Sequence, residues 1–78
     1  MTRENFYDWV ERIKEIDQEY EETRYLGFFQ KKIKLAAVKN HYEMAQGAIN
    51  LHIDKMEPDV REDAKHVLEY LENTLNNW

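Results

Sequence analysis

The 78-residue chain contains no cysteine and no serine, only two glycines and one proline. Without cysteine no disulfide can stabilise a small fold, and metal sites built on thiolates are excluded. A turn-rich β-fold needs far more glycine and proline than this. No apolar run approaches the ~20 residues that cross a bilayer, and charges occupy the N-terminal stretch where a signal peptide is apolar. These absences predict a cytoplasmic, all-α protein with no membrane span.

Groups for catalysis are equally scarce. Apart from three threonines the usual hydroxyl and thiol nucleophiles are missing, and two glycines cannot build a phosphate-binding loop. His41 and His52 lie three turns apart on a predicted helix, ~16 Å, which is too far to bind one metal ion. His66 has acids at one-turn spacing and is the remaining candidate for metal binding or acid–base chemistry. We predict a protein that is not an enzyme, with no catalytic residues, no cofactor and no metal.

What the chain does have is helical periodicity. Apolar residues at spacings of three and four predict helices at about 3–25, 29–56 and 58–76. Residues 1–78 are therefore expected to form a single helical domain, in which the first and third helices pack on the second.

Local chemistry predicts where these helices begin and end. Thr2 is suited to cap the first helix, and Pro58 to open the third at its first position. Gly27 is expected to end the first helix in the left-handed conformation, with Phe28 folding back onto the last turn. Gly47, inside the second helix, is expected to mark a close approach between helices.

The second helix carries two apolar stripes on nearly opposite sides. The first stripe consists of Leu35, Val38, Tyr42, Ala45, Ile49, Ile53 and Met56. The second stripe consists of Phe29, Ile33, Ala36, Ala37, Met44, Ala48 and Leu51. A helix in a plain three-helix bundle needs only one apolar face. The pattern therefore predicts a three-helix bundle with a long, two-faced central helix, completed by homodimerisation, and the first stripe is the predicted dimer or helix-packing face. In the alternative, the outer helices cover one stripe each and the monomer is complete.

Charge is segregated along the chain. Residues 1–22 and 43–78 each hold three basic residues against eight acids, a net charge of −5 apiece, whereas residues 23–42 hold five basic residues and no acid. The lysines at 31, 32, 34 and 39 fall on different sides of the predicted helix. We expect them to neutralise the acidic helices, within the chain or across a dimer.

On the first helix the acids line up opposite the apolar side. The acidic ridge consists of Asp8, Glu11, Glu15, Glu19 and Glu22, and it is about 21 Å long. Such a row of like charges suits a partner protein with a basic surface, and complementary charge of this kind raises the association rate. Small size and acidity are typical of inhibitors carried by phages and mobile elements, such as anti-CRISPR and anti-restriction proteins. We therefore predict a small acidic inhibitor or adaptor that docks on a basic, nucleic-acid-binding protein.

The alternative is a nucleic-acid-binding helical dimer that uses the lysine-rich segment, residues 24–39. Phosphate binding needs several basic contacts, but these lysines are split between helix sides, and the net charge of −5 repels nucleic acid. The aromatic residues nearby, Phe28, Phe29 and Tyr42, have helical spacing and are expected in the core rather than as base-stacking platforms. Nucleic acid is therefore the less favoured partner.

Overall fold

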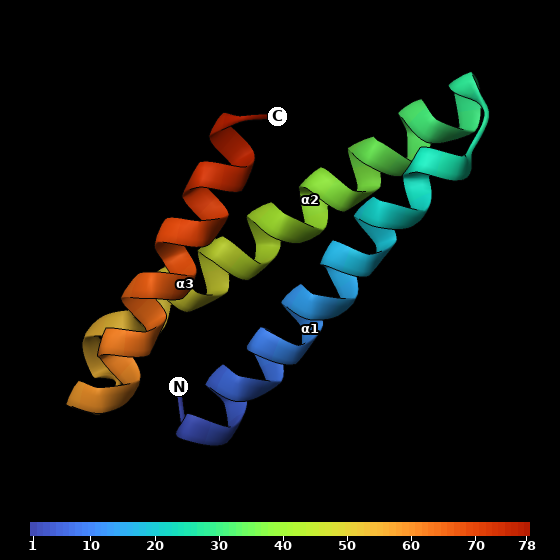
Figure 1. Cartoon of the computed structure of the whole chain (residues 1–78). Coiled ribbons are helices and arrows are strands. Elements are labelled where there is room, and N and C mark those ends of the chain that lie inside the picture. Colours follow the sequence, from blue (N-terminus) through green and yellow to red (C-terminus); the bar gives the residue numbers. More distant parts are fainter.

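The computed structural model describes all residues from Met1 to Trp78 and contains three α-helices and no strand (Figure 1). Helix α1 spans Arg3–Glu22, α2 spans Phe28–His52 and α3 spans Pro58–Asn76. Short 3₁₀ turns at Thr23–Tyr25 and Ile53–Lys55 follow α1 and α2. The predicted all-α helical bundle is thus confirmed.

Two of the predicted helix starts are made by the expected residues. The Thr2 hydroxyl oxygen accepts a hydrogen bond from the Asn5 N–H at 3.2 Å, which satisfies one of the unpaired donors at the start of α1. Pro58 occupies the first position of α3, where its missing N–H removes no intrahelical hydrogen bond.

The predictions for Gly27 and Phe28 are wrong. Gly27 has an extended backbone, with φ −67° and ψ 165°, and serves as the N-cap position of α2. Phe28 does not fold back, because its side chain is 77% exposed. The chain instead reverses after the 3₁₀ turn through two extended residues, Leu26 and Gly27. The Thr23 hydroxyl donates to the Tyr20 carbonyl at 2.6 Å and holds this turn in place.

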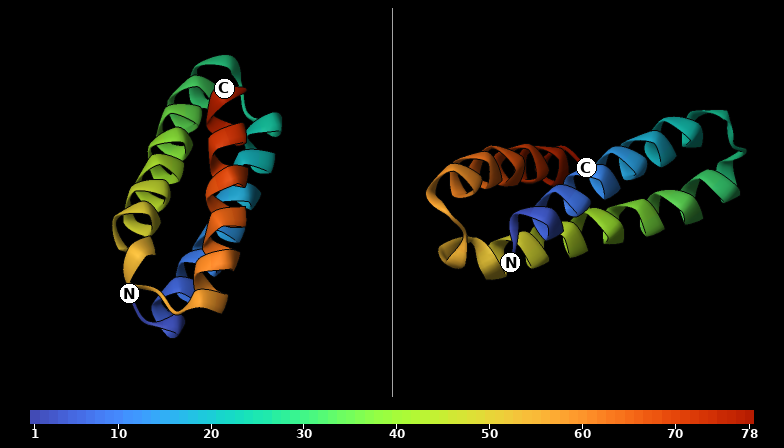
Figure 2. Two further views of the ribbon diagram at one scale, coloured as in Figure 1. Left: turned by 90° about the vertical axis from the view of Figure 1, so that its left-hand side faces the viewer. Right: turned by 90° about the horizontal axis from the view of Figure 1, so that it is seen from below.

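The helices form two successive antiparallel hairpins, so that α2 contacts both α1 and α3 (Figure 2). α1 and α3 also touch each other, which places both on the same side of α2. Burying a large apolar side chain contributes about 1.5–3 kcal/mol, and one cluster between the three helices supplies this stabilisation. Its members are Phe6, Ile13, Ile16, Val38, Tyr42, Ala45, Ile49, Met56, Val60, Ala64 and Leu71.

Helix α3 covers only part of the length of α2. The C-terminal Trp78 lies beside Tyr20 and Tyr42. Its ring centroid is 5.4 Å from that of Tyr20 and 6.1 Å from that of Tyr42. Beyond that level the α1–α2 hairpin continues alone, and both views show it projecting past the end of α3 (Figures 1 and 2). We call this projecting part, residues 24–37, the hairpin tip.

Gly47 does not mark a close approach between helices of this chain. A Cβ atom at this position would meet no atom within 4 Å. The glycine lies on the side of α2 that faces away from α1 and α3, so the crowding that the sequence suggested does not occur inside the monomer.

Candidate interaction surfaces

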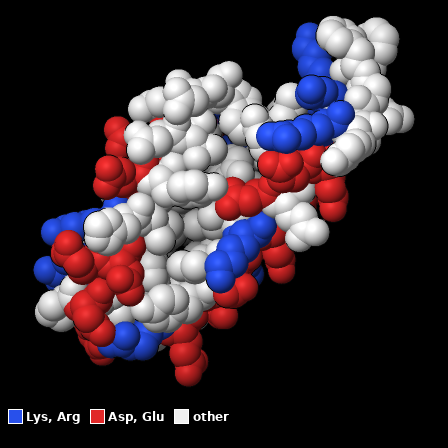
Figure 3. All heavy atoms as spheres, in the orientation of Figure 1, with Lys and Arg blue, Asp and Glu red and all other residues white.

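The acidic ridge lies on the outer side of α1, where red side chains follow the edge of the helix (Figure 3). Four of its five acids are exposed, and Glu19 is half-buried. Glu11 Oε1 pairs with Lys14 Nζ at 3.1 Å, within the same helix. Asp8, Glu15 and Glu22 form no ion pair within 4.0 Å. Most of the ridge charge is therefore available to solvent or to a partner.

One ridge residue reaches the neighbouring helix. Glu19 Oε2 lies 3.3 Å from His41 Nδ1 of α2, and both residues line a shallow groove of about 260 Å³ between α1 and α2. Trp9, Arg12 and Met44 also line this groove, and the Arg12 guanidinium stacks 4.9 Å from the Trp9 ring centroid. The ridge thus borders a groove with aromatic, basic and acidic groups along its walls.

The lysines of α2 do not neutralise the ridge within the chain. None of the four lysines at 31, 32, 34 and 39 forms an ion pair within 4.0 Å, and Arg24 pairs only with Glu21 of its own turn, at 3.4 Å. The physical reason is the orientation of α2. It turns its first stripe toward α1, which leaves the lysines on its flanks and at the hairpin tip.

The first stripe of α2 lies inside the bundle. Val38, Tyr42, Ala45, Ile49 and Met56 are buried there, and the remaining two members, at positions 35 and 53, are half-buried. Both neighbouring helices pack against this one stripe. Five of its seven members thus pack against the helices of the monomer, which leaves little of the stripe exposed.

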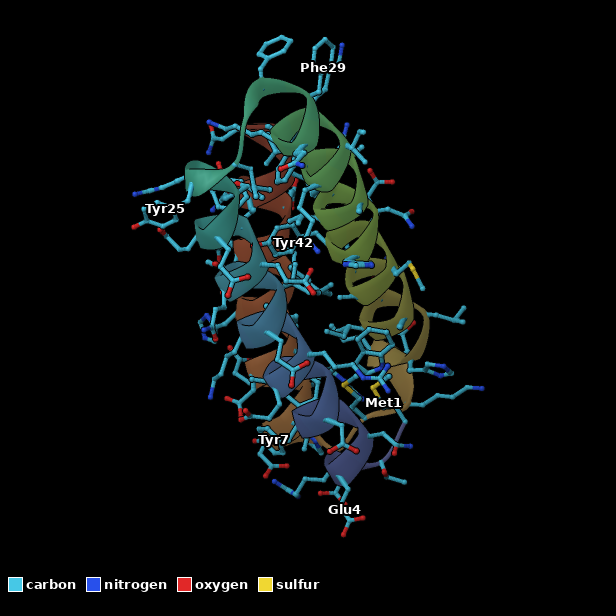
Figure 4. The ribbon with its side chains drawn as sticks, turned by 90° about the vertical axis from the view of Figure 1, so that its right-hand side faces the viewer. Met1, Glu4, Tyr7, Tyr25, Phe29 and Tyr42 are labelled. Atoms are coloured by element: carbon cyan, nitrogen blue, oxygen red, sulfur yellow. The ribbon has the colours of Figure 1, made fainter.

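The second stripe is left on the surface. Phe29, Ile33, Met44 and Leu51 are exposed by 78%, 74%, 56% and 76%, although they are among the most apolar side chains of the helix. Figure 4 shows Phe29 and Tyr25 pointing away from the bundle at the hairpin tip, while Tyr42 lies between the helices. The prediction that Phe28 and Phe29 belong to the core is therefore wrong, whereas it is confirmed for Tyr42.

A half-buried carboxylate that sequence reasoning missed links all three helices. Asp17 Oδ1 of α1 accepts hydrogen bonds from the Tyr42 hydroxyl of α2 at 2.5 Å and from the Tyr70 hydroxyl of α3 at 2.9 Å. Burial, and then the hydrogen bond to Asp17, raise the pKa of both tyrosines above the ordinary value of 10.0. The signal was present in the sequence, because Asp17 follows Ile16 on the apolar side of α1, where an acid needs partners.

A second set of polar contacts joins α1 to the start of α3. Arg3 Nη2 lies 2.6 Å from Glu57 Oε2 and 2.7 Å from Asp59 Oδ2, and the Tyr7 hydroxyl donates to Asp63 Oδ2 at 2.8 Å. The Arg3 hydrogen bond lowers the pKa of Asp59. These groups are more than 50 residues apart in the chain, so their spacing in the sequence could not reveal the contacts. Ion pairs as exposed as these contribute little to stability.

The alternative of a metal site at His66 is not supported. No group of three or more histidine, aspartate and glutamate side chains is arranged to hold a metal ion. No helix combines the length and the hydropathy needed to cross a bilayer.

The fold and its surfaces define an all-α, three-helix protein whose distinctive features are an acidic ridge on α1 and an exposed apolar stripe on α2. Comparisons with protein-family models, with curated proteins and with solved structures find no match.

Proposed function

We propose that this chain is a non-enzymatic interaction protein whose acidic ridge docks on a basic surface of a nucleic-acid-binding protein. The observation that carries the proposal is the state of Asp8, Glu15 and Glu22, which are exposed and have no cationic partner in the fold. Like charges along one helix face destabilise it by about 0.2–0.5 kcal/mol per pair. A basic partner relieves this repulsion, and a row of carboxylates about 21 Å long imitates a phosphate backbone.

Occupying a nucleic-acid site in this way makes the chain an inhibitor or an adaptor. The small, acidic inhibitors of phages and mobile elements, anti-CRISPR and anti-restriction proteins among them, are the class that this proposal favours. The acting form in this proposal is a homodimer, whose two copies would join through residues of α2 rather than through the ridge.

The test neutralises the ridge without disturbing the fold. The triple variant Asp8→Asn, Glu15→Gln, Glu22→Gln removes only acids that form no ion pair. Proteins that bind the wild-type chain in a lysate are identified by mass spectrometry, and the association rate of each purified protein is then measured at low and high salt. The ridge variant is expected to slow association at least about tenfold at low salt, and the difference should shrink as salt screens the charges.

A matched control separates the ridge from net charge. The variant Glu62→Gln, Glu69→Gln, Glu72→Gln changes the charge of the chain by the same amount on α3 and should associate at nearly the wild-type rate. Equal rates for the wild type and the ridge variant would reject the ridge as the docking surface. Equal slowing by both variants would show that net charge alone acts.

A second candidate function is favoured by one observation at the hairpin tip. Tyr25, Phe28 and Phe29 are exposed there, and Figure 4 shows Tyr25 and Phe29 pointing away from the bundle. Phe28 lines a shallow hollow with the lysines at 31 and 32, which form no ion pair within 4.0 Å. Aromatic rings beside basic groups suit single-stranded nucleic acid. This candidate predicts that labelled single-stranded RNA or DNA binds with an affinity that falls with salt. It also predicts that Phe29→Ala weakens binding by about 1–3 kcal/mol. No binding at the lowest salt concentration would remove this candidate.

A further inference from the structure

The second stripe of α2 is an apolar surface that the fold leaves without a partner. It runs from Phe29 to Leu51, along nearly the whole of the helix, and its four large side chains are all more than half exposed. At about 1.5 Å per residue its length is ~33 Å, in a molecule 44 Å long. An exposed apolar strip of this extent is typical of an interface.

Most of the exposed side of α2 is spaced symmetrically about Asn40. The stripe members at positions 29, 33 and 36 precede Asn40 by eleven, seven and four residues. The stripe members at 44 and 51, with Gly47 between them, follow it at the same intervals, and only the two small members at 37 and 48 have no such counterpart. When two such helices pack antiparallel with Asn40 at the centre, each side chain of one copy meets the mirrored position of the other. Phe29 meets Leu51 of the second copy, Ile33 meets Gly47, and Ala36 meets Met44.

The sizes of these side chains are complementary in that arrangement. Ile33 lies opposite a glycine, and Met44 lies opposite an alanine, so a large group meets a small one twice in each copy. Gly47 has open space above it, since a Cβ there would touch nothing within 4 Å. The close approach that a glycine permits is therefore available to a second chain, although none of this chain's own helices uses it.

Asn40 lies at the centre of the stripe and is exposed, with its amide nitrogen 3.8 Å from Met44 Sδ. In helix pairs a single asparagine within an apolar seam specifies the register, because it needs a polar partner. On the two-fold axis its partner is the same asparagine of the second copy.

Charge selects the antiparallel orientation. In a parallel pair the lysines at 31, 32, 34 and 39 would lie beside their own copies, and α2 has no acid before Glu43 to offset them. In the antiparallel pair, Lys39 and the Glu43 of the second copy lie on the same flank, offset by about 3 Å along the axis. Neither residue forms an ion pair within its own chain, so both are free to form this one, twice per dimer.

We infer that the second stripe of α2 binds a second copy of this chain in an antiparallel, two-fold dimer centred on Asn40. Because a single helix pair makes an interface at the low end of the size range for specific complexes, the dimer forms in a concentration-dependent manner. The surface is distinct from the acidic ridge on α1, so dimerisation and docking through the ridge are tested by different variants.

The first test is the native mass of the full chain by sedimentation over about 1–500 μM. The wild type is expected to rise from 9.6 kDa toward twice that mass. Ile33→Glu places two carboxylates in the seam and is expected to weaken the dimer at least about 100-fold. Gln18→Glu adds the same charge at an exposed position of α1 and should dimerise as the wild type does. Helicity by circular dichroism should be equal in all three, because Ile33 is outside the core.

The second test determines the register by disulfide formation. The chain has no cysteine, so each variant introduces a single thiol. Asn40→Cys alone, and an equimolar mixture of Ile33→Cys with Gly47→Cys, are expected to form covalent dimers on mild oxidation. Gly47→Cys alone should not, because its two copies lie ~21 Å apart, beyond disulfide reach.

Three results would overturn the inference. A mass of 9.6 kDa at every concentration would show that no dimer forms. A dimer that survives Ile33→Glu would place the interface on another face. Covalent dimers from Gly47→Cys alone, formed as fast as those from Asn40→Cys, would show a parallel arrangement.

Discussion

Replacing Tyr42 by alanine is expected to destabilise the fold by about 3–5 kcal/mol, as truncation of a large buried aromatic side chain does. Tyr42 is only 2% exposed, packs at the junction of the three helices and donates a hydrogen bond to Asp17. A domain of this size is stable by about 4–12 kcal/mol in total. Urea unfolding followed by circular dichroism should therefore show a greatly lowered midpoint, or no folded baseline.

The variant Tyr42→Phe separates packing from the hydrogen bond. It keeps the ring and removes the hydroxyl, so the expected loss of stability is only about 1–3 kcal/mol, because Asp17 keeps its hydrogen bond from Tyr70.

The pKa of Tyr42 is raised above 10.0, first by burial and then by the hydrogen bond to Asp17. A raised pKa means that the stabilisation is complete below pH 10 and is lost as the pH rises above it. Tyr42→Phe should therefore lose less stability than the wild type between about pH 9 and 11. If the wild type and Tyr42→Phe lost the same amount of stability over this pH range, the result would contradict the role of the hydrogen bond.

Replacing Phe6 by alanine is the other change with a large expected effect, about 3–5 kcal/mol. Phe6 is fully buried at the base of the bundle, with its ring centroid 5.0 Å from that of Tyr7. The same substitution at Phe29 removes a side chain that is 78% exposed, and it should change the stability of the monomer by less than about 0.5 kcal/mol. The two variants differ only in where the ring lies, so the comparison measures burial directly.

The comparison should be made at low protein concentration, by thermal unfolding at a few micromolar. Dimerisation through the second stripe would otherwise add a concentration-dependent contribution from Phe29. Similar losses of stability for Phe6→Ala and Phe29→Ala at low concentration would mean that the second stripe is covered within the monomer, which would contradict the exposed position of Phe29 on α2.

Features that depend on neighbouring residues could be predicted from the sequence. The cap at Thr2, the start of α3 at Pro58 and the existence of two stripes on α2 follow from local chemistry and from helical periodicity. The stripe that the bundle covers could not be predicted, since both have suitable spacing. That choice depends on α1 and α3 also contacting each other, which a pattern along one helix does not contain.

The candidate surfaces also divide into features that local sequence predicts and features that only the folded chain reveals. The exposed position of the acidic ridge could be predicted, because its acids recur every three or four residues on the side of α1 opposite the buried Ile13 and Ile16. The sequence predicts a left-handed Gly27, and this prediction is wrong because glycine permits that conformation without requiring it. The polar links of Asp17 to Tyr70 and of Arg3 to Asp59 join residues more than 50 positions apart, so only the assembled bundle reveals them.

The projection of the α1–α2 hairpin past Trp78 also bears on how binding proceeds. The tip has one neighbouring helix where the rest of α2 has two, so local opening costs less free energy there than at the base. The exposed side chains of Tyr25, Phe28 and Phe29 therefore sit on the most adaptable part of the backbone. A partner that contacts this end meets a surface able to adjust its shape during the encounter, whereas Asp17 links the three helices next to the end of α3.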